Sequence, residues 1–247
     1  LTLQPTHMLL AVLPEGMLLL LLAGILLSIF PLADSPQPTL RLAWVWLLVP
    51  LGRISLPGSA NFDGIRHYME MLPAAALLAG WAGAWMFGRV SQKGALARVS
   101  AIALLALLVA VPAMDAWQRY GVYQHVYFNR LMGGQAQAAE IFGESEAADY
   151  WGVTYRAGMD WLNHNAGVNA ALVVPIAPWL VSLTEPIWLR EDIQVISPEE
   201  AAEAGGDLYV MLITNSGARE EPQAAACLAD AQPAFSIQVE GYSFMQI

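Results

Sequence analysis

The sequence has few charged residues. Only 13% of its 247 residues are charged and 57% are hydrophobic, whereas about 25% of the residues in an ordinary soluble domain are charged. The charges are also unevenly spread. Residues 1–114 hold six basic and four acidic residues, and residues 115–247 hold five basic and seventeen acidic residues. We therefore expect two regions that face different solvents, with the change near Pro112–Asp115.

Other absences exclude several classes of protein. Cys227 is the only cysteine, so an internal disulfide is impossible. The excess of acid in residues 115–247 excludes nucleic-acid binding through phosphate neutralisation. The sequence has no phosphate-binding loop, dinucleotide-binding glycine motif or nucleophile elbow, and none of its four histidines has a second ligand at metal spacing. We therefore expect no metal and no cofactor.

Long apolar runs dominate the first region. Pro14 and Glu15 suit the start of a helix, and Trp81 and Trp85 suit an aromatic belt at a membrane surface. The runs predict that residues 1–114 form about four transmembrane helices, at about 14–32, 40–56, 67–87 and 98–113.

The distribution of cations predicts the orientation of these helices. The link at 88–98 holds Arg89, Lys93 and Arg98 without an acid, and Arg41 lies in a link on the same side. Cytoplasmic loops are enriched in Lys and Arg. We therefore expect the loop at 57–67 and the whole of 115–247 to lie outside the cytoplasm.

The second region reads as an extracytoplasmic α/β domain, residues 115–247. Its first segment, 115–132, has aromatic residues at helical spacing, which predicts an amphipathic helix in the membrane interface or, alternatively, a helix that faces the core of this domain. The remaining pattern predicts a small open sheet with at least one parallel pair of strands. The expected elements are helices at 154–163 and 198–204, strands at 170–176 and 207–214, and a hairpin or edge strand at 235–247.

Two polar segments are candidates for binding. The first holds Asp63, Arg66, His67 and Tyr68, where the third apolar run begins on the predicted outer side. A guanidinium matches phosphate oxygens in pairs, so Arg66 and His67 can hold a phosphate, with Tyr68 at the headgroup level. Alternatively, Arg66 and Tyr68 only anchor the helix at the interface. The second segment, 149–162, is acidic and aromatic, and it either binds a sugar or packs the domain.

Both segments resemble those of a known family. Residues 61–80, with Arg66, His67, Tyr68, Pro73 and the run Leu77–Gly80, resemble a late transmembrane segment of bacterial family-39-like glycosyltransferases of the GT-C class, which are similar to protein mannosyltransferases. Residues 149–162 look like the start of the C-terminal extracytoplasmic domain in some of these proteins. The resemblance covers roughly residues 10–215.

The resemblance implies an integral enzyme of the bacterial cell (inner) membrane, which transfers a sugar from a polyprenyl-phosphate donor to an acceptor that the sequence does not identify. Arg66, His67, Tyr68 and Asp63 would bind the donor. The family's catalytic base is an acid in the first external loop, and nothing here matches it. We therefore expect a C-terminal part of such an enzyme, without a catalytic residue and inactive alone. The alternative is a non-catalytic, membrane-anchored extracytoplasmic binding or assembly module.

Overall fold

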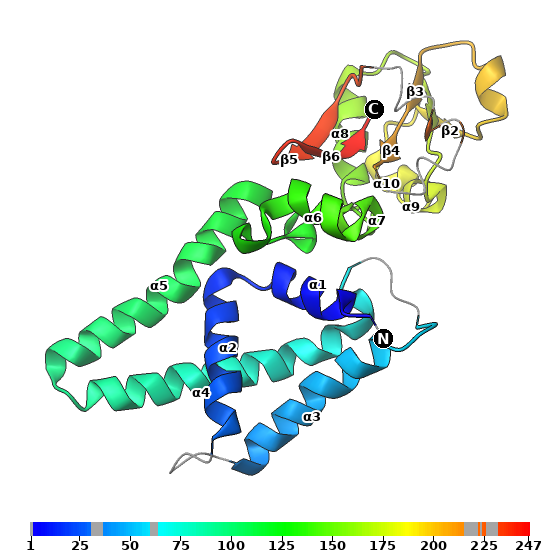
Figure 1. Ribbon diagram of the computed structural model, residues 1–247. Coiled ribbons are helices and arrows are strands. Elements are labelled where there is room, and N and C mark those ends of the chain that lie inside the picture. The colour runs from blue at the N-terminus through cyan, green and yellow to red at the C-terminus, as the bar shows by residue number, and fades with distance from the viewer. Residues whose placement is uncertain (1, 31–36, 60–63, 215–221, 223, 226–231) are drawn as a thin grey trace. The chain divides into compact units, whose positions relative to one another are not determined.

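A computed structural model describes residues 2–30, 37–59, 64–214, 222, 224–225 and 232–247 (Figure 1). Within it the chain forms two compact units, Leu1–Gly134 and Gln135–Ile247. Each unit is described by itself below. Asp63, one of the predicted donor-binding residues, lies outside the described residues.

The described part of the first unit is helical. Two of its helical segments, Arg66–Ser91 and Ala95–Tyr120, are long and apolar enough to cross a membrane, and Glu15–Ile29 is a shorter apolar helix. The four apolar runs of the sequence all form helices, but α2 and α3 do not meet this criterion. In chain order the elements are α1 Gln4–Val12, α2 Glu15–Ile29, α3 Gln37–Ile54, the 3-10 turn η1 Arg66–Met71, α4 Leu72–Ser91, α5 Ala95–Tyr120, and the 3-10 turns η2 Gln124–Val126 and η3 Arg130–Met132.

Helix α2 packs against α4 and α5 through glycines. A Cβ on Gly16 would overlap the carbonyl oxygen of Leu108 in α5, and a Cβ on Gly24 would overlap that of Leu78 in α4. Small residues allow helix backbones to approach this closely. Helix α4 contributes small buried residues of its own: Ala74, Ala75, Ala79, Ala82 and Gly83.

The outward faces of these helices are apolar as well. Helix α5 is the clearest case, because few residues in the apolar part of this helix are buried by the rest of the protein. A hydrophobic side chain that no protein atom covers requires another apolar environment. The exposed large hydrophobic residues of α5 are Leu96, Val99, Ile102, Leu104, Leu107, Val109, Val111, Met114 and Trp117.

Helix α5 differs from the prediction, which ended the fourth helix at 113 and placed a separate helix at 115–132. Pro112 lies inside α5, which continues to Tyr120 and ends at Gly121 with a positive φ of 53°. An ion pair between Asp115 and Arg119, one turn apart, supports the extra turns. Gly121 adopts a conformation that few other residues tolerate, and the chain then turns away instead of continuing as a helix.

The second unit contains two small sheets. Strands β2, β1 and β3 form a parallel sheet in that order, and β4, β6 and β5 form an antiparallel one. The parallel pair and the C-terminal hairpin agree with the sequence pattern, whereas β2 was not expected. The strands are β1 Ala171–Val173, β2 Gln194–Ile196, β3 Leu208–Val210, β4 Leu212–Ile213, β5 Ser236–Val239 and β6 Tyr242–Gln246. The helices are α6 Gly134–Phe142, α7 Glu144–Ala147, α8 Tyr155–Asn165, α9 Pro178–Ser182, α10 Glu185–Trp188 and the 3-10 turn η4 Glu200–Glu203.

The predicted strand at 207–214 divides between the two sheets. Val210 ends β3, and the buried Met211 then donates its backbone N–H to the carbonyl of Val173 in β1. Leu212 begins β4, which pairs with β6. Helix α8 packs nearby, because a Cβ on Gly158 would overlap the sulfur of Met211.

Candidate functional site

The predicted phosphate-binding residues lie in η1, the turn that precedes α4. Arg66 and His67 are half-buried, and Arg66 Nε donates to His67 Nε2 at 3.2 Å. This bond places a guanidinium and an imidazole side by side.

The end of α3 holds this turn in place. Arg53 lies in the last turn of α3, where its charge is favourable. Its Nη2 donates to the backbone carbonyl of His67 at 2.8 Å and to Glu70 Oε1 at 2.5 Å. Both side chains of the Arg53–Glu70 pair are about half exposed. We call Arg53, Arg66, His67 and Glu70 the η1 cluster.

Tyr68 has a different position from the one expected at the headgroup level. Its side chain is fully buried inside the first unit. The backbone of Tyr68 departs from helical geometry, with φ of −144°, which places a kink inside η1. The buried side chain of Tyr68 therefore anchors η1 in the first unit, while the side chains of Arg66 and His67 stay partly exposed.

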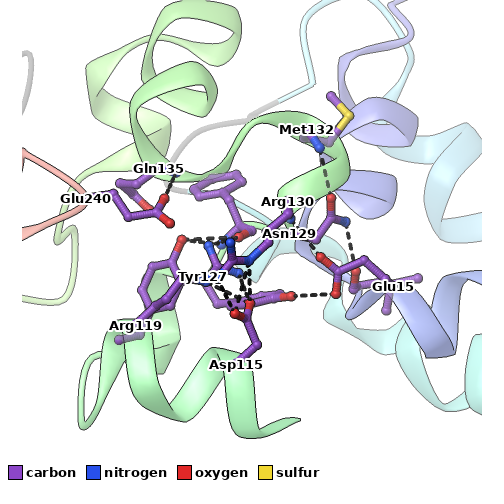
Figure 2. A network of polar contacts seen from close by, with 12 residues as sticks. Glu15, Asp115, Arg119, Tyr127, Asn129, Arg130, Met132, Gln135 and Glu240 are labelled. Atoms are coloured by element: carbon purple, nitrogen blue, oxygen red, sulfur yellow. Dashed lines mark hydrogen bonds and ion pairs between the residues drawn. The ribbon is translucent and has the colours of Figure 1, made fainter. Parts of the chain in front are cut away.

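A second polar cluster lies where α5 ends, and Figure 2 shows its contacts. Asp115 in α5 is its centre. Arg130 Nη2 lies 2.5 Å from Asp115 Oδ1, and Arg119 Nη2 lies 2.7 Å from Asp115 Oδ2. The Arg119 side chain is only 9% exposed, so Asp115 supplies the counter-charge that a guanidinium in this position requires. The Arg130 side chain is 66% exposed.

The same cluster reaches the start of α2. The carboxylate of Glu15 accepts a hydrogen bond from the backbone N–H of Arg130 at 2.8 Å and one from the hydroxyl of Tyr127 at 3.4 Å. Burial, followed by the negative charge of Glu15, raises the pKa of Tyr127 above its usual value. Tyr127 therefore stays protonated and acts as a hydrogen-bond donor at physiological pH.

Asn129 connects this cluster to α1. Its side-chain amide donates to the carbonyl oxygens of Leu10 at 2.6 Å and Leu13 at 2.8 Å, and its backbone N–H donates to that of Ala11. The last carbonyls of a helix have no partner within the helix. Asn129, which is fully buried, therefore caps the C-terminal end of α1. We call Glu15, Asp115, Arg119, Tyr127, Asn129 and Arg130 the α5-end cluster.

Helix α1 links the two clusters. Just before α1, the backbone N–H of Thr2 donates to the carbonyl of Ser55, next to the end of α3. The other end of α1 is held by Asn129. Nine helical residues span about 13 Å, so the two clusters lie at the same end of the first unit, with α1 between them. Figure 1 shows α1 running crosswise to α2.

The two clusters have different chemical capacities. In the α5-end cluster the acids Glu15 and Asp115 accept from Arg119, Arg130 and Tyr127, so its charges hold elements together. The η1 cluster has one acid, Glu70, which pairs with Arg53. A guanidinium such as that of Arg66 matches phosphate oxygens in pairs. Among the described residues, no group of three histidine, cysteine or acidic side chains could hold a metal ion.

The segment at 149–162 serves packing in this structure. Asp149 is fully buried and accepts from the backbone N–H and the hydroxyl of Thr154, at 2.8 and 2.7 Å. These bonds fix the turn that leads into α8, and three residues of α8, Tyr155, Met159 and Leu162, are buried. Trp151 is about half exposed. The carboxylate of Asp149 is thus directed into the fold, whereas that of Asp160 is exposed.

The sequence pattern did not predict the α5-end cluster or the role of Arg53. Tyr120, Tyr123 and Tyr127 recur at helical spacing, which predicts a helix in the membrane interface or a helix that faces the core of the second region. The actual partner of Tyr127, Glu15, lies 112 residues earlier in the chain. The one available signal was an acid directly at the start of an apolar run, which marks a position where a buried or interfacial partner is needed.

Comparison with known proteins found no matching family model, no similar curated protein and no similar solved structure.

Proposed function

We propose that the first unit is embedded in a membrane. The observation that carries this proposal is the position of its charges. Every charged residue of the unit that the structure describes lies in a helix end or a connecting turn, as with Glu15, Arg53, Arg89 and Asp115. Between these ends the helices carry exposed leucine, valine and isoleucine side chains. This three-zone distribution suits a hydrocarbon layer between two aqueous surfaces.

The orientation follows from the cations. Arg89, Lys93 and Arg98 cluster at the turn between α4 and α5, which we place on the cytoplasmic side. The η1 cluster, α1 and the end of α5 then face the opposite side. Because the chain leaves α5 on that side, we propose that residues 135–247 lie outside the cytoplasm of a bacterial cell.

We further propose that the chain is part of a membrane glycosyltransferase of the GT-C class, and that the η1 cluster binds the phosphate of a polyprenyl-phosphate sugar. Arg66 supports this role because its guanidinium lies at the membrane boundary, half-buried and beside His67. A charge-assisted bond to phosphate is strong in such partly desolvated surroundings. The acid that activates the acceptor has no counterpart in this cluster, since Glu70 pairs with Arg53.

The test uses the full-length protein in lipid vesicles. Sugar transfer from a polyprenyl-phosphate donor and donor binding would be measured for wild type, Arg66→Ala and Arg66→Lys. Loss of the phosphate contact predicts at least a tenfold fall in both quantities for Arg66→Ala, about 1.4 kcal/mol, and partial retention for Arg66→Lys. Arg130→Ala is the matched control, because Arg130 is an exposed arginine at the same end that pairs with Asp115.

One observation favours a second candidate, a non-catalytic membrane-anchored binding or assembly module. The acids of both clusters pair with nearby cations or hydroxyls, and Tyr68 is fully buried, as in a purely structural arrangement. Absence of transfer by wild type with every donor tested would favour this module. Transfer that is unchanged in Arg66→Ala would retain the enzyme and assign Arg66 to anchoring the helix.

A further inference from the structure

A groove runs between α4 and α5, at the end of the first unit opposite the two clusters. Its lining is almost entirely apolar, and Arg89 is its one charged residue. The groove is open on its outer side, where α5 is exposed. The lining residues are Trp85, Met86, Phe87, Arg89, Val90, Ser100, Ala101, Leu104, Leu105 and Leu108.

The groove contains a polar group that lacks a partner. The indole Nε1 of Trp85 is buried and has no hydrogen-bond partner within the described part of the chain. A buried N–H without an acceptor costs about 1–3 kcal/mol. The guanidinium of Arg89 lies over the same ring, 5.2 Å from its centroid. The ring of Trp85 thus lines the groove while its N–H stays buried, and Arg89 places a cation beside the same ring.

Two more cations lie close by in the sequence. Lys93 is in the turn that joins α4 to α5, and Arg98 is in the first turn of α5. Among the residues that the structure describes, no hydrogen bond or ion pair joins Arg89, Lys93 or Arg98 to a carboxylate. This contrasts with Arg53, Arg119, Arg130 and Arg190, all of which pair with acids. The turn therefore carries positive charge that nothing in the described chain neutralises.

We propose that this groove binds one anionic phospholipid. An acyl chain lies along Ala101, Leu104 and Leu108, and the phosphate accepts from the exposed Arg89. Lys93 and Arg98 add positive potential at the same surface. Basic pockets between transmembrane helices on the cytoplasmic side are suited to anionic headgroups. A choline headgroup would bring its own cation toward three others, so the site favours a lipid with net negative charge.

The proposal requires that the first unit lies in a membrane, but it does not require the transferase activity. Flotation of the chain with vesicles tests the membrane placement separately. Failure to float would overturn that placement, whereas flotation without a preference for a headgroup would overturn only the lipid site.

The decisive experiment measures lipid binding to the whole chain in detergent by native mass spectrometry. Phosphatidylglycerol and phosphatidylcholine with identical acyl chains would be titrated separately. We expect phosphatidylglycerol to bind at least tenfold more tightly. Arg89→Ala should remove most of this preference. Arg41→Ala is the control, because Arg41 is an exposed cation near the start of α3, outside the groove.

Two further measurements distinguish a groove from a simple cationic surface. Ser100→Phe places a ring in the groove and should weaken both lipids while leaving the melting temperature unchanged. Free glycerol phosphate should not compete with phosphatidylglycerol. Equal binding of the two lipids, equal effects of Arg89→Ala and Arg41→Ala, or displacement by glycerol phosphate would each overturn the proposal.

Discussion

Asn129 donates its side-chain amide to the carbonyl oxygen of Leu10, 119 residues earlier in the chain, at a distance of 2.6 Å. The same amide donates to Leu13, and its oxygen accepts from the backbone N–H of Met132. One side chain thus closes the end of α1 and begins η3. The contact fixes α1 across the end of the helical unit that carries both polar clusters.

Asn129→Ala should therefore release α1. It leaves the carbonyls of Leu10 and Leu13 without the amide donor, and a buried carbonyl without a partner costs about 1–3 kcal/mol. We expect a lower melting temperature in detergent and faster amide hydrogen exchange in residues 4–12. Gln118→Ala, at an exposed position of α5, should change neither quantity. Unchanged exchange in α1 would show that Asn129 does not hold this helix.

Asp115 should matter more than Arg130. Asp115→Asn removes the counter-charge of Arg119, whose side chain is 9% exposed, and we expect a loss of about 1–3 kcal/mol. Arg130→Ala removes a side chain that is 66% exposed, and a surface ion pair contributes about 0–1 kcal/mol. Thermal unfolding of the two variants in the same detergent gives the comparison. Equal losses would mean that the burial of Arg119 does not set the stability of the cluster.

The glycines of α2 provide a third prediction. Gly16→Ala and Gly24→Ala place a methyl group against the backbones of α5 and α4, and overpacking of this kind costs about 1–3 kcal/mol. Gly80→Ala in α4 is the matched control, because its added methyl group meets nothing within 4 Å. The control should be neutral or slightly stabilising, since alanine favours helix. Size-exclusion profiles and melting temperatures of the three variants measure the difference.

The fourth prediction concerns the pH dependence of the second unit. Arg190, together with the backbone N–H of Asn169, holds the pKa of Asp192 at about 2, below its usual value. Arg190 also donates to the carbonyls of Ala166 and Gly167. A carboxyl whose pKa is depressed on folding stabilises the fold above its unfolded pKa of about 4. That contribution is lost as the pH falls from about 4 toward 2.

Amide hydrogen exchange measures this effect in the whole chain. Protection around residues 163–170 should fall as the pH drops from 4 to 2, after correction for the intrinsic exchange rate. Asp192→Asn should show low protection already at pH 5 and a flat profile below it. A wild-type profile that is flat over the same range would contradict the assignment.

The features that the sequence predicted are those that depend on neighbouring residues, and those that it missed depend on contacts between distant residues. Helices α2 to α5 could be predicted because each consists of a continuous apolar run, a local property of the chain. Helix α5 continues through Pro112 to Tyr120, beyond the end at 113 that the apolar run predicted, and the ion pair between Asp115 and Arg119 lies in these added turns. Strand β2, three residues long and partly exposed, carries almost no periodic signal.

The candidate sites show the same difference between local patterns and long-range contacts. Arg66 and His67 are adjacent in sequence, and their position before an apolar run made them candidates for binding; the hydrogen bond between their side chains was not predicted. Burial of Tyr68 was not foreseen, because it depends on the kink inside η1 and on the end of α3. The link from Glu15 to Arg130 spans 115 residues and leaves no trace in local spacing.

Met211 lies where a single run of chain leaves the parallel sheet and joins the antiparallel one. Successive residues of a strand point to opposite faces. The number of residues at this junction therefore decides which side chains face the core in each sheet. Deleting Met211 would reverse the facing of every residue on one side of it, and at least one sheet would then expose its buried side chains. The single residue between β3 and β4 thus sets which side chains are buried in both sheets. Such a junction tolerates substitutions of similar size but no change of length.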